Sequence, residues 1–308
     1  MVRLWVANTD SDWFDFLASQ PGIDEVNFWQ PSGSSNFGAI HSGELFLFRL
    51  KSPRNAIGGY GVFSHSSNLP ISLAWEAFGI KNGAASFDEM RVRVGKYRDR
   101  SASPQHDYVV GARILVQPLF FPERLWIPQP DSWTRSIVVG KTYNTGDEEG
   151  LRLWDRVAEA SELSSKPPGG GDTLQARFGQ PTLILPRLGQ GAFRVSVTDA
   201  YRRACAVSGG KVLPALDAAH IRPYASGGLH EISNGILLRR DIHSIFDAGY
   251  ATISENLRFI VSDRVRSEFN NGEEYRRLHG QRLALPSMPT HQPDREALRW
   301  HNESKFLG

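Results

Sequence analysis

The 308-residue sequence has a single cysteine, Cys205. One cysteine excludes an intrachain disulfide and any structural zinc site built from several thiolates. No stretch approaches the roughly 18 uninterrupted apolar residues that a membrane span needs, and the amino terminus turns polar and acidic within its first ten residues, unlike the apolar core of a secretory signal. These absences favour a cytoplasmic protein with no membrane role.

The sequence also lacks a large excess of either positive or negative residues, and its net charge is only +2. Its distribution is uneven. Residues 175–308 hold 18 Lys and Arg against 13 Asp and Glu, a net +5, whereas residues 1–174 hold 17 against 20, a net −3. A partner with a phosphate backbone favours such a basic carboxy-terminal part, although the excess is mild.

The length predicts two domains of ordinary size. The clearest boundary is the stretch SELSSKPPGGGDTLQ, whose Ser, Pro and three consecutive Gly residues cannot support a packed element. We therefore expect one domain over residues 1–160, a linker over 161–176 and a second domain over 177–308. Seven of the eight tryptophans precede this linker, which indicates that the two sides differ in function.

The first domain is predicted to be α+β with β structure dominant. Apolar and strand-like segments occupy residues 44–50, 56–63 and 109–121, and two short helices are expected, over 11–19 with Ser11 or Asp12 as cap and over 71–79 with an end at Gly79. Many short strands with few helices favour a small closed or half-closed barrel.

In the second domain, a helix that runs into a turn is expected over residues 197–209. A strand over 212–221, a polar loop over 222–234 and a second strand that leads into a helix ending at Gly249 are expected to follow. A hairpin is predicted over 250–262. Three candidate site residues lie on these expected elements: His220 ends the first strand, Asn234 ends the loop and His243 lies on the helix.

The stretch LDAAHIRPYASGGLHEISNGILLRRDIHSIFDAGY, residues 216–250, resembles the HNH endonuclease family, in its branch without zinc-binding cysteines. The resemblance extends more loosely over residues 178–300. It implies a ββα-metal fold, in which two strands and a helix hold a single divalent ion, and a phosphodiester hydrolase that acts on DNA.

Phosphodiester hydrolysis requires an attacking water, a base that deprotonates it and a cation that neutralises the charge developing on the phosphate. By similarity to the family, His220 is the general base, Asn234 holds the loop that positions the base, and His243 is a metal ligand. Asp247 lies one helical turn after His243, where many family members have a second ligand. A carboxylate there suits Mg²⁺ or Mn²⁺.

The sequence departs from the common family pattern just before the base. Many HNH enzymes place a metal ligand there, and this chain has Ala219. Asp217 is reminiscent of related ββα nucleases with a single protein ligand, Asp241 lies on the wrong helical face to join His243, and Asp247 ranks above both.

Ordinary structural interpretations compete with several of these assignments. His230 and His279 are expected to be core histidines with backbone partners, and Cys205 a buried small residue. Asp247 is as readily a surface carboxylate at the end of a helix as a ligand. Three arginines are candidates for contacts with DNA phosphates, with a solvated basic rim as the alternative: Arg222, Arg239 and Arg240.

Residues 1–160 resemble, more weakly, the EVE group of the PUA-like superfamily, through segments such as WVANTD, VNFWQPSG and GELFLFRL. The resemblance implies a pseudo-β-barrel that binds a modified base. Reading such a base means extruding it from the duplex and stacking it between rings, while polar groups check its edge. The candidates are the rings of Trp29, Phe63 and Trp75, with Asn8 or Ser32 as edge readers, although aromatic residues at strand spacing are more often core.

Together these resemblances lead to the expectation of a type IV-like restriction endonuclease that recognises 5-methylcytosine or 5-hydroxymethylcytosine in double-stranded DNA and acts as a homodimer. One alternative is an HNH nuclease without modification dependence. The other, motivated by Ala219, is a nucleic-acid-binding module with a vestigial nuclease fold.

Overall fold

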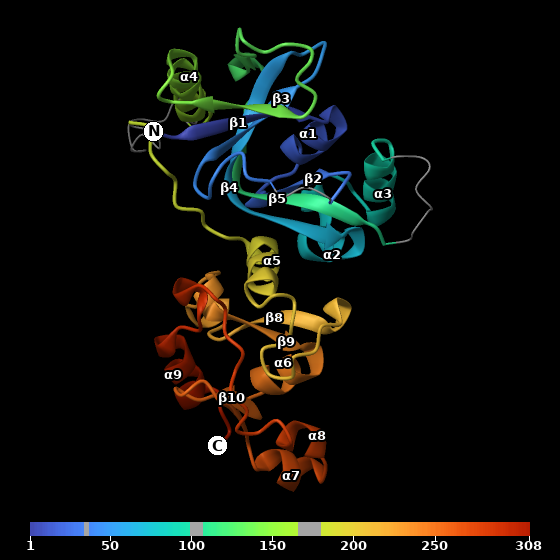
Figure 1. Ribbon diagram of the computed structural model, residues 1–308, viewed down its shortest axis with the longest axis vertical. Coiled ribbons are helices and arrows are strands. Elements are labelled where there is room, and N and C mark those ends of the chain that lie inside the picture. The colour runs from blue at the N-terminus through green and yellow to red at the C-terminus, as the bar shows by residue number, and fades with distance from the viewer. Residues whose placement is uncertain (34–36, 99–106, 166–179) are drawn as a thin grey trace. The chain divides into compact units, whose positions relative to one another are not determined.

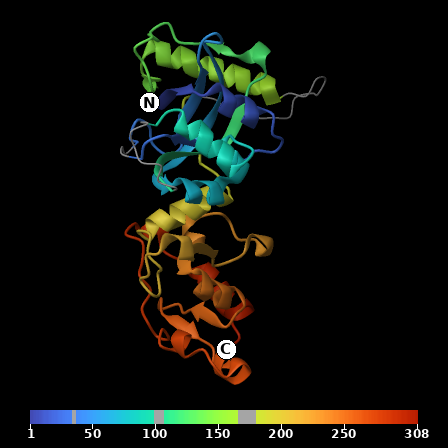
Figure 2. The ribbon, with the colours of Figure 1, turned by 90° about the vertical axis from the view of Figure 1, so that its right-hand side faces the viewer.

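The computed structural model describes residues 1–33, 37–98, 107–165 and 180–308. The chain divides into two compact units, Met1–Ala192 and Phe193–Gly308, and the elements of each can be followed in Figures 1 and 2. Among the described residues, no helix is both long and apolar enough to span a bilayer.

The first unit is built on a seven-stranded sheet, counted over the described residues, in the order β2-β5-β4-β3-β1-β7, with β6 paired to β4. The strands are β1 (Arg3–Thr9), β2 (Glu25–Gln30), β3 (Leu45–Leu50), β4 (Ala56–Pro70), β5 (Val109–Phe120), β6 (Ile127–Pro128) and β7 (Gly140–Asn144). Strands β1 and β3 are parallel, and the other pairs are antiparallel. Since β2 and β7 stand at opposite ends of this order, the described pairings form a large sheet within a mixed α and β unit and do not close a barrel.

The apolar segments of the sequence form the centre of this sheet. The strands expected over 44–50, 56–63 and 109–121 are confirmed as β3, β4 and β5. All six residues of β3 are buried, as a central strand covered on both faces requires. Strand β4 continues beyond the expected end to Pro70, and shifts in its register with β5 on both sides of Val62 let it bend while it stays paired.

Four α-helices accompany the sheet in the described part of this unit: α1 (Ser11–Ala18), α2 (Ile71–Phe78), α3 (Phe87–Gly95) and α4 (Glu148–Ser165). The cap of α1 differs from the prediction. Asp10, one residue earlier than either expected cap, accepts a hydrogen bond from the backbone N–H of Trp13. The end of α2 at Gly79 is confirmed, and this glycine has a φ of 49°.

The boundaries of the units differ from those predicted from composition. Helix α4 runs to Ser165, past the expected start of the linker, and residues 166–179 lie outside the described part. Residues 180–192 belong to the first unit. The buried carboxylate of Glu25 accepts hydrogen bonds from the backbone N–H groups of Gly191 and Ala192, both at 2.8 Å, and these contacts between distant parts of the chain have no signature in composition.

The second unit begins in α5 (Gln190–Ala200), whose residues from Phe193 onward belong to it. The antiparallel strands β8 (Leu216–His220) and β9 (Gly235–Arg239) follow, and α6 (Arg240–Asp247) starts directly after β9. Helix α6 contacts both strands, so the unit contains the predicted succession of two strands and a helix (Figure 1). Strand β9 begins at Gly235, a position that only glycine fits. A Cβ there would stand 2.5 Å from Val197 and 2.9 Å from the ring of Phe193.

The predicted hairpin is present as β10 (Ala251–Ile253) and β11 (Phe259–Val261), followed by α7 (Arg264–Phe269), α8 (Glu273–Arg276) and α9 (Arg295–Ser304). His301 of α9 fixes these elements to α6. Its Nδ1 lies 2.8 Å from the hydroxyl of Thr252, its Nε2 lies 3.3 Å from the carbonyl of Phe246, and its ring stacks on that of Phe246 at 3.8 Å.

The contacts of His301 with Thr252 and Phe246 generate a prediction about stability in acid. Burial lowers the pKa of His301 to about 4, below the value near 6.5 expected in the unfolded chain. The unfolded state therefore binds a proton before the folded state does, and the stability that His301 contributes above pH 6.5 falls as the pH drops toward 4, by roughly 3 kcal/mol in total. Unfolding measured at a series of pH values should be less acid-sensitive in His301→Gln than in the wild type, even though the variant is less stable at neutral pH. Equal acid sensitivity in both proteins would contradict this assignment.

Candidate functional site

His220 lies at the end of β8, with its ring fixed on two sides. The ring stacks on Phe193 at 4.0 Å between centroids with 11° between planes, and Phe193 is itself 1% exposed. On the other side, His220 Nε2 lies 3.0 Å from His230 Nδ1. His230 is half-buried and stacks on Tyr224. The expectation that His230 is a core histidine with a backbone partner is therefore wrong.

The surroundings of His220 keep its imidazole neutral. Burial, followed by the nearby charges of His230 and His243, lowers the pKa of His220 to about 4. At neutral pH the ring therefore has a nitrogen lone pair with which it can accept a proton. His243 lies on α6, which contacts β8, the strand that ends at His220.

Asn234 closes the loop between β8 and β9. Its side-chain oxygen accepts a hydrogen bond from the N–H of Arg222 at 2.9 Å, and its amide nitrogen donates to the carbonyls of Arg222 and Leu229, both at 2.9 Å. The side chain is buried, so these three bonds satisfy polar groups that water does not reach. The amide thus clamps the two ends of the loop that carries His230, and no contact between Asn234 and His220 is needed for this role.

His243 lies on α6 between two carboxylates. Its Nδ1 is 3.2 Å from the Asp217 carboxylate on β8, and its Nε2 is 3.1 Å from the carboxylate of Asp247, one turn later on the helix. Arg194 of α5 extends the arrangement, because its Nε lies 3.8 Å from the other oxygen of Asp217. The site is thus assembled from α5, β8 and α6.

The two carboxylates decide the protonation of His243. Burial alone would lower its pKa, but the hydrogen bonds and charges of Asp217 and Asp247 outweigh burial and raise the pKa to about 9. The same contact acts on Asp217, whose pKa burial would raise but His243 and Arg194 hold below its ordinary value. Two neighbouring histidines are therefore in opposite states at neutral pH, His220 neutral and His243 protonated.

A divalent cation fits one side of His243. A separation of 3.1 Å between His243 Nε2 and the Asp247 oxygen is that of two adjacent ligands on one ion whose ligand distances are about 2.1 Å. Asp217 bonds the opposite ring nitrogen and orients the ring, as the outer carboxylates of metal-bound histidines do. The described residues hold no group of three or more His, Cys, Asp and Glu suited to a metal.

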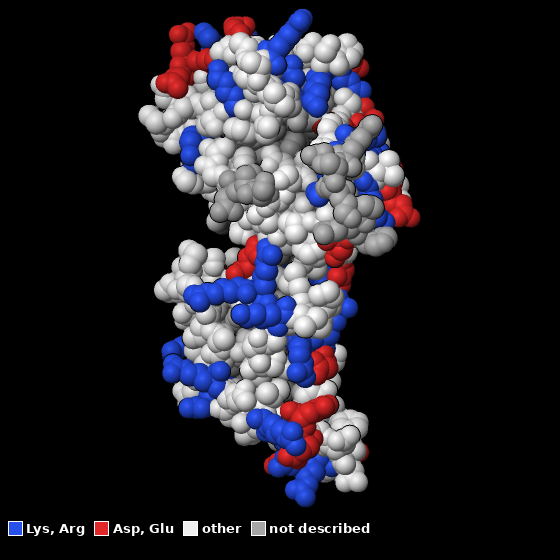
Figure 3. Space-filling model, turned by 45° about the vertical axis from the view of Figure 1, so that its right-hand side comes forward, with Lys and Arg blue, Asp and Glu red and all other residues white. Residues whose placement is uncertain are grey.

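The three arginines predicted to contact DNA have different surroundings. Arg239 forms a double ion pair with Asp241, at 2.9 and 2.5 Å. Arg222 donates to the carbonyl of Ser226 and lies 5.5 Å from the ring of Trp300, while Arg240 is exposed. Figure 3 shows several groups of Lys and Arg side chains on one face of the second unit, with Asp and Glu side chains between them.

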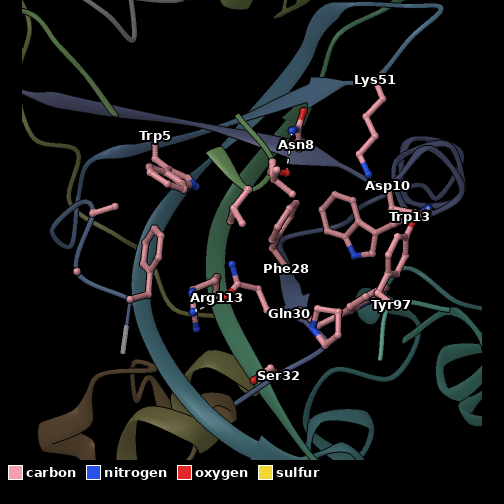
Figure 4. A pocket seen from close by; sticks show the side chains of 17 residues that line it. Trp5, Asn8, Asp10, Trp13, Phe28, Gln30, Ser32, Lys51, Tyr97 and Arg113 are labelled. Carbon is pink, nitrogen blue, oxygen red and sulfur yellow. Dashed lines mark hydrogen bonds between the residues drawn. The ribbon is translucent and has the colours of Figure 1, made fainter. Parts of the chain in front are cut away.

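The first unit contains a separate cavity of about 700 Å³. Six rings line it: Trp5, Trp13, Phe28, Trp29, Phe37 and Tyr97. Figure 4 shows Trp5 on one side and Trp13 and Tyr97 on the other, with Phe28 between them. We call it the aromatic pocket. It is large enough for a nucleobase, and its rings offer the stacking surfaces that a flipped base requires.

Polar groups stand at defined places in the aromatic pocket. Arg113 is 2% exposed, and one of its terminal nitrogens donates to Gln30 at 2.8 Å. Burial lowers the pKa of this guanidinium to about 10. Across the pocket, the Tyr97 hydroxyl donates to Asp10 at 2.5 Å, and this bond raises the pKa of Tyr97 to about 12. These groups can check the polar edge of a bound ring.

The structure brings three of the five predicted base-binding residues to this pocket. Trp29, Asn8 and Ser32 line it. Phe63 is buried against Phe37, and Trp75 lies on α2 with its ring 6.2 Å from Phe87; neither of these two is among the lining residues.

Sequence reasoning missed His230 and Arg194 in the second unit and Arg113 and Tyr97 in the first. Arg113 carried a usable signal, because it is a charged residue inside the strongly apolar segment VVGARILV. The other three gave none, since their roles depend on contacts across the loop and between elements.

Comparison with known proteins bears on the second unit. Residues 205–254 match the HNH endonuclease family. This segment is an HNH endonuclease domain. A solved structure titled "Modification dependent TagI restriction endonuclease" is similar to this chain at 15% identity with a TM-score of 0.27, over 87% of this chain and 63% of that one. The chain thus spans less than two thirds of that protein. No curated protein matches the sequence.

The position of Asp217 generates a prediction that does not depend on turnover. Asp217→Asn keeps the size of the side chain but removes the charge that orients His243, so the affinity for Mn²⁺ should fall by about 10- to 100-fold. Titration calorimetry or the electron paramagnetic resonance of free Mn²⁺ measures this affinity. Asp241→Asn is the matched control, because Asp241 lies on the same helix as His243 but pairs with Arg239. Wild-type affinity in Asp217→Asn would exclude the orienting role.

Proposed function

We propose that the protein is a metal-dependent, modification-directed restriction endonuclease, in which the HNH domain hydrolyses DNA near a modified cytosine held by the first unit. The neutral imidazole of His220 beside the paired His243 and Asp247 carries the nuclease part of the proposal. The aromatic pocket supports the recognition part, because an HNH domain contacts DNA with little sequence preference and gains its targeting from an attached domain.

The protonation pattern assigns a role to each imidazole. His220 accepts the proton of the attacking water, and its low pKa ensures that the lone pair is available. Because Nε2 faces His230, the accepting atom is Nδ1, which requires that Nε2 carry the proton and donate it to His230 Nδ1. His230 and Phe193 therefore fix both the tautomer and the direction of the base.

The residues suited to holding the cation are His243 and Asp247. An ion held there, Mg²⁺ or Mn²⁺, would supply positive charge to neutralise the charge that develops on the scissile phosphate. His243 must release its proton for this binding, and Asp217, on the other ring nitrogen, keeps Nε2 directed toward Asp247 when it does. Asn234 preserves the loop geometry on which the positions of His220 and His230 depend.

The recognition part predicts dependence of cleavage on the base. Plasmids identical in sequence but carrying cytosine, 5-methylcytosine or 5-hydroxymethylcytosine are incubated with the protein and Mg²⁺ or Mn²⁺. We expect cleavage of at least one modified plasmid and little or none of the unmodified one, since an unmodified base leaves the pocket contacts unmade. Equal cutting of all three would leave an HNH nuclease without modification dependence. Absence of cutting with either metal would favour a binding module with a vestigial nuclease fold.

The catalytic part predicts the behaviour of His220→Ala. Loss of a general base should lower the cleavage rate by about 10²- to 10⁴-fold while binding to modified DNA is preserved. His279→Ala serves as the matched control, because His279 lies in the same unit and bonds only the backbone of Val261 among the described contacts. If His220→Ala cleaves at the wild-type rate, another group is the base.

A further inference from the structure

A second cavity of about 530 Å³ lies beside the aromatic pocket in the first unit. Three cationic side chains line it, Arg49, Lys51 and Arg135, and none of its described lining residues is acidic. We call it the cationic cavity. Three positive charges in one concave site, with no carboxylate among the lining residues, make a strong local field that favours an anion.

Arg49 is the buried, hydrogen-bonded cation of this cavity. It is 7% exposed, and its guanidinium donates hydrogen bonds to neutral amide oxygens: Asn8 at 2.6 Å, Asn55 at 3.0 Å and Gln129 at 2.5 Å. Its guanidinium also lies 4.9 Å from the centre of the Trp133 ring. Amides fix the direction of the guanidinium but do not neutralise it, and burial lowers its pKa. A buried arginine is ordinarily paired with an acid, so this charge is arranged for an anion that the cavity receives.

The cationic cavity and the aromatic pocket share a wall. Asn8 and Lys51 line both, and Figure 4 labels both at one end of the aromatic pocket. Asn8 also holds the wall in place, since its amide nitrogen donates to the carbonyls of Ile137 and Val138, which line the cationic cavity and the aromatic pocket respectively. A nucleotide whose base enters the aromatic pocket would therefore have its own phosphate near the cations.

We propose that the cationic cavity binds the phosphodiester of the nucleotide whose modified base occupies the aromatic pocket, with Arg49, Lys51 and Arg135 as the phosphate ligands. The inference rests on the proposed function and adds the anchor that holds a flipped nucleotide by its backbone. It also gives Asn8 a role different from edge reading, because both ends of its side chain are already bonded to Arg49 and to the 137–138 backbone.

The most direct test compares a nucleotide with its nucleoside. The full-length protein is titrated in EDTA with 5-methyldeoxycytidine and with its 5′-monophosphate, and the same pair is tested with the 5-hydroxymethyl group. The monophosphate should bind about tenfold more tightly than the nucleoside. In Lys51→Gln and Arg135→Gln, two exposed positions whose replacement should not disturb folding, this advantage should shrink about three- to tenfold. In Arg135→Gln, which changes a residue outside the aromatic pocket, the affinity for the nucleoside should stay within twofold.

Arg156→Gln is the matched control, because Arg156 is an exposed arginine of α4 outside both cavities. It should leave the phosphate advantage unchanged. Arg49→Lys keeps the charge but loses the planar fork, so it should keep part of the advantage, with thermal unfolding used to verify that it folds.

A second measurement uses duplex DNA. With a single modified cytosine and no divalent metal, the logarithm of the binding constant should fall less steeply with the logarithm of salt concentration in Lys51→Gln and in Arg135→Gln, by about one unit of slope for the cation lost in each. Arg156→Gln should keep the wild-type slope.

The outcomes separate the two proposals. If the wild type does not prefer a modified nucleoside to deoxycytidine, the recognition part of the proposed function fails. If it does prefer it, but the phosphate adds no affinity or adds as much in Lys51→Gln and Arg135→Gln as in the wild type, the cationic cavity is not the phosphate site and the inference is overturned.

Discussion

The imidazole of His243, fixed between the carboxylates of Asp217 and Asp247, is the interaction on which the nuclease site depends. It joins β8, the strand that ends at His220, to α6, and it presents one nitrogen together with a carboxylate at the spacing of two ligands on one ion. Because one carboxylate bonds each ring nitrogen, the ring has a single orientation. The clamp made by Asn234 and the clasp made by His301 then act around this centre, the first on the loop before β9 and the second on the end of α6.

Much of this site could be predicted from the sequence because it is local. His220, Asn234, His243 and Asp247 fall within 28 residues, in the stretch that resembles the HNH family. The order of the two strands and the helix around them follows from apolar periodicity and from the stop at Gly249. The relation of Asp247 to His243 is a property of helix geometry alone. The same reasoning located strands β3, β4 and β5, whose apolar segments have no competing interpretation.

What escaped prediction depends on contacts between distant parts of the chain. His230 has the sequence surroundings of a loop residue, and only the folding of the loop brings its Nδ1 to His220. The first unit extends to Ala192 because a buried Glu25 bonds the backbone there, a contact between residues 166 positions apart or more. Phe63 and Trp75 illustrate a further limit, since pattern shows that a ring is apolar but not whether it faces a core or a cavity.

The two units use one physical principle in opposite ways. In the HNH domain, the charge of the half-buried His243 is compensated by two acids within the protein. In the first unit, Arg49 and Arg113 are buried with neutral amide oxygens among their described partners, so their charge remains available to a ligand. In the function that we propose, compensated charge organises the catalytic centre, whereas uncompensated charge prepares the first unit to bind a polyanion such as DNA.

The central claim is that His243 and Asp247 hold the catalytic cation within reach of His220. Crystals of the protein grown with Mn²⁺, with diffraction recorded at the manganese absorption edge, test it most directly. The account predicts an anomalous peak about 2.1–2.2 Å from both His243 Nε2 and an Asp247 oxygen, with His220 facing a water or phosphate oxygen on that ion. A fully occupied peak elsewhere in the HNH domain, with His243 still bonded to both carboxylates, would contradict it.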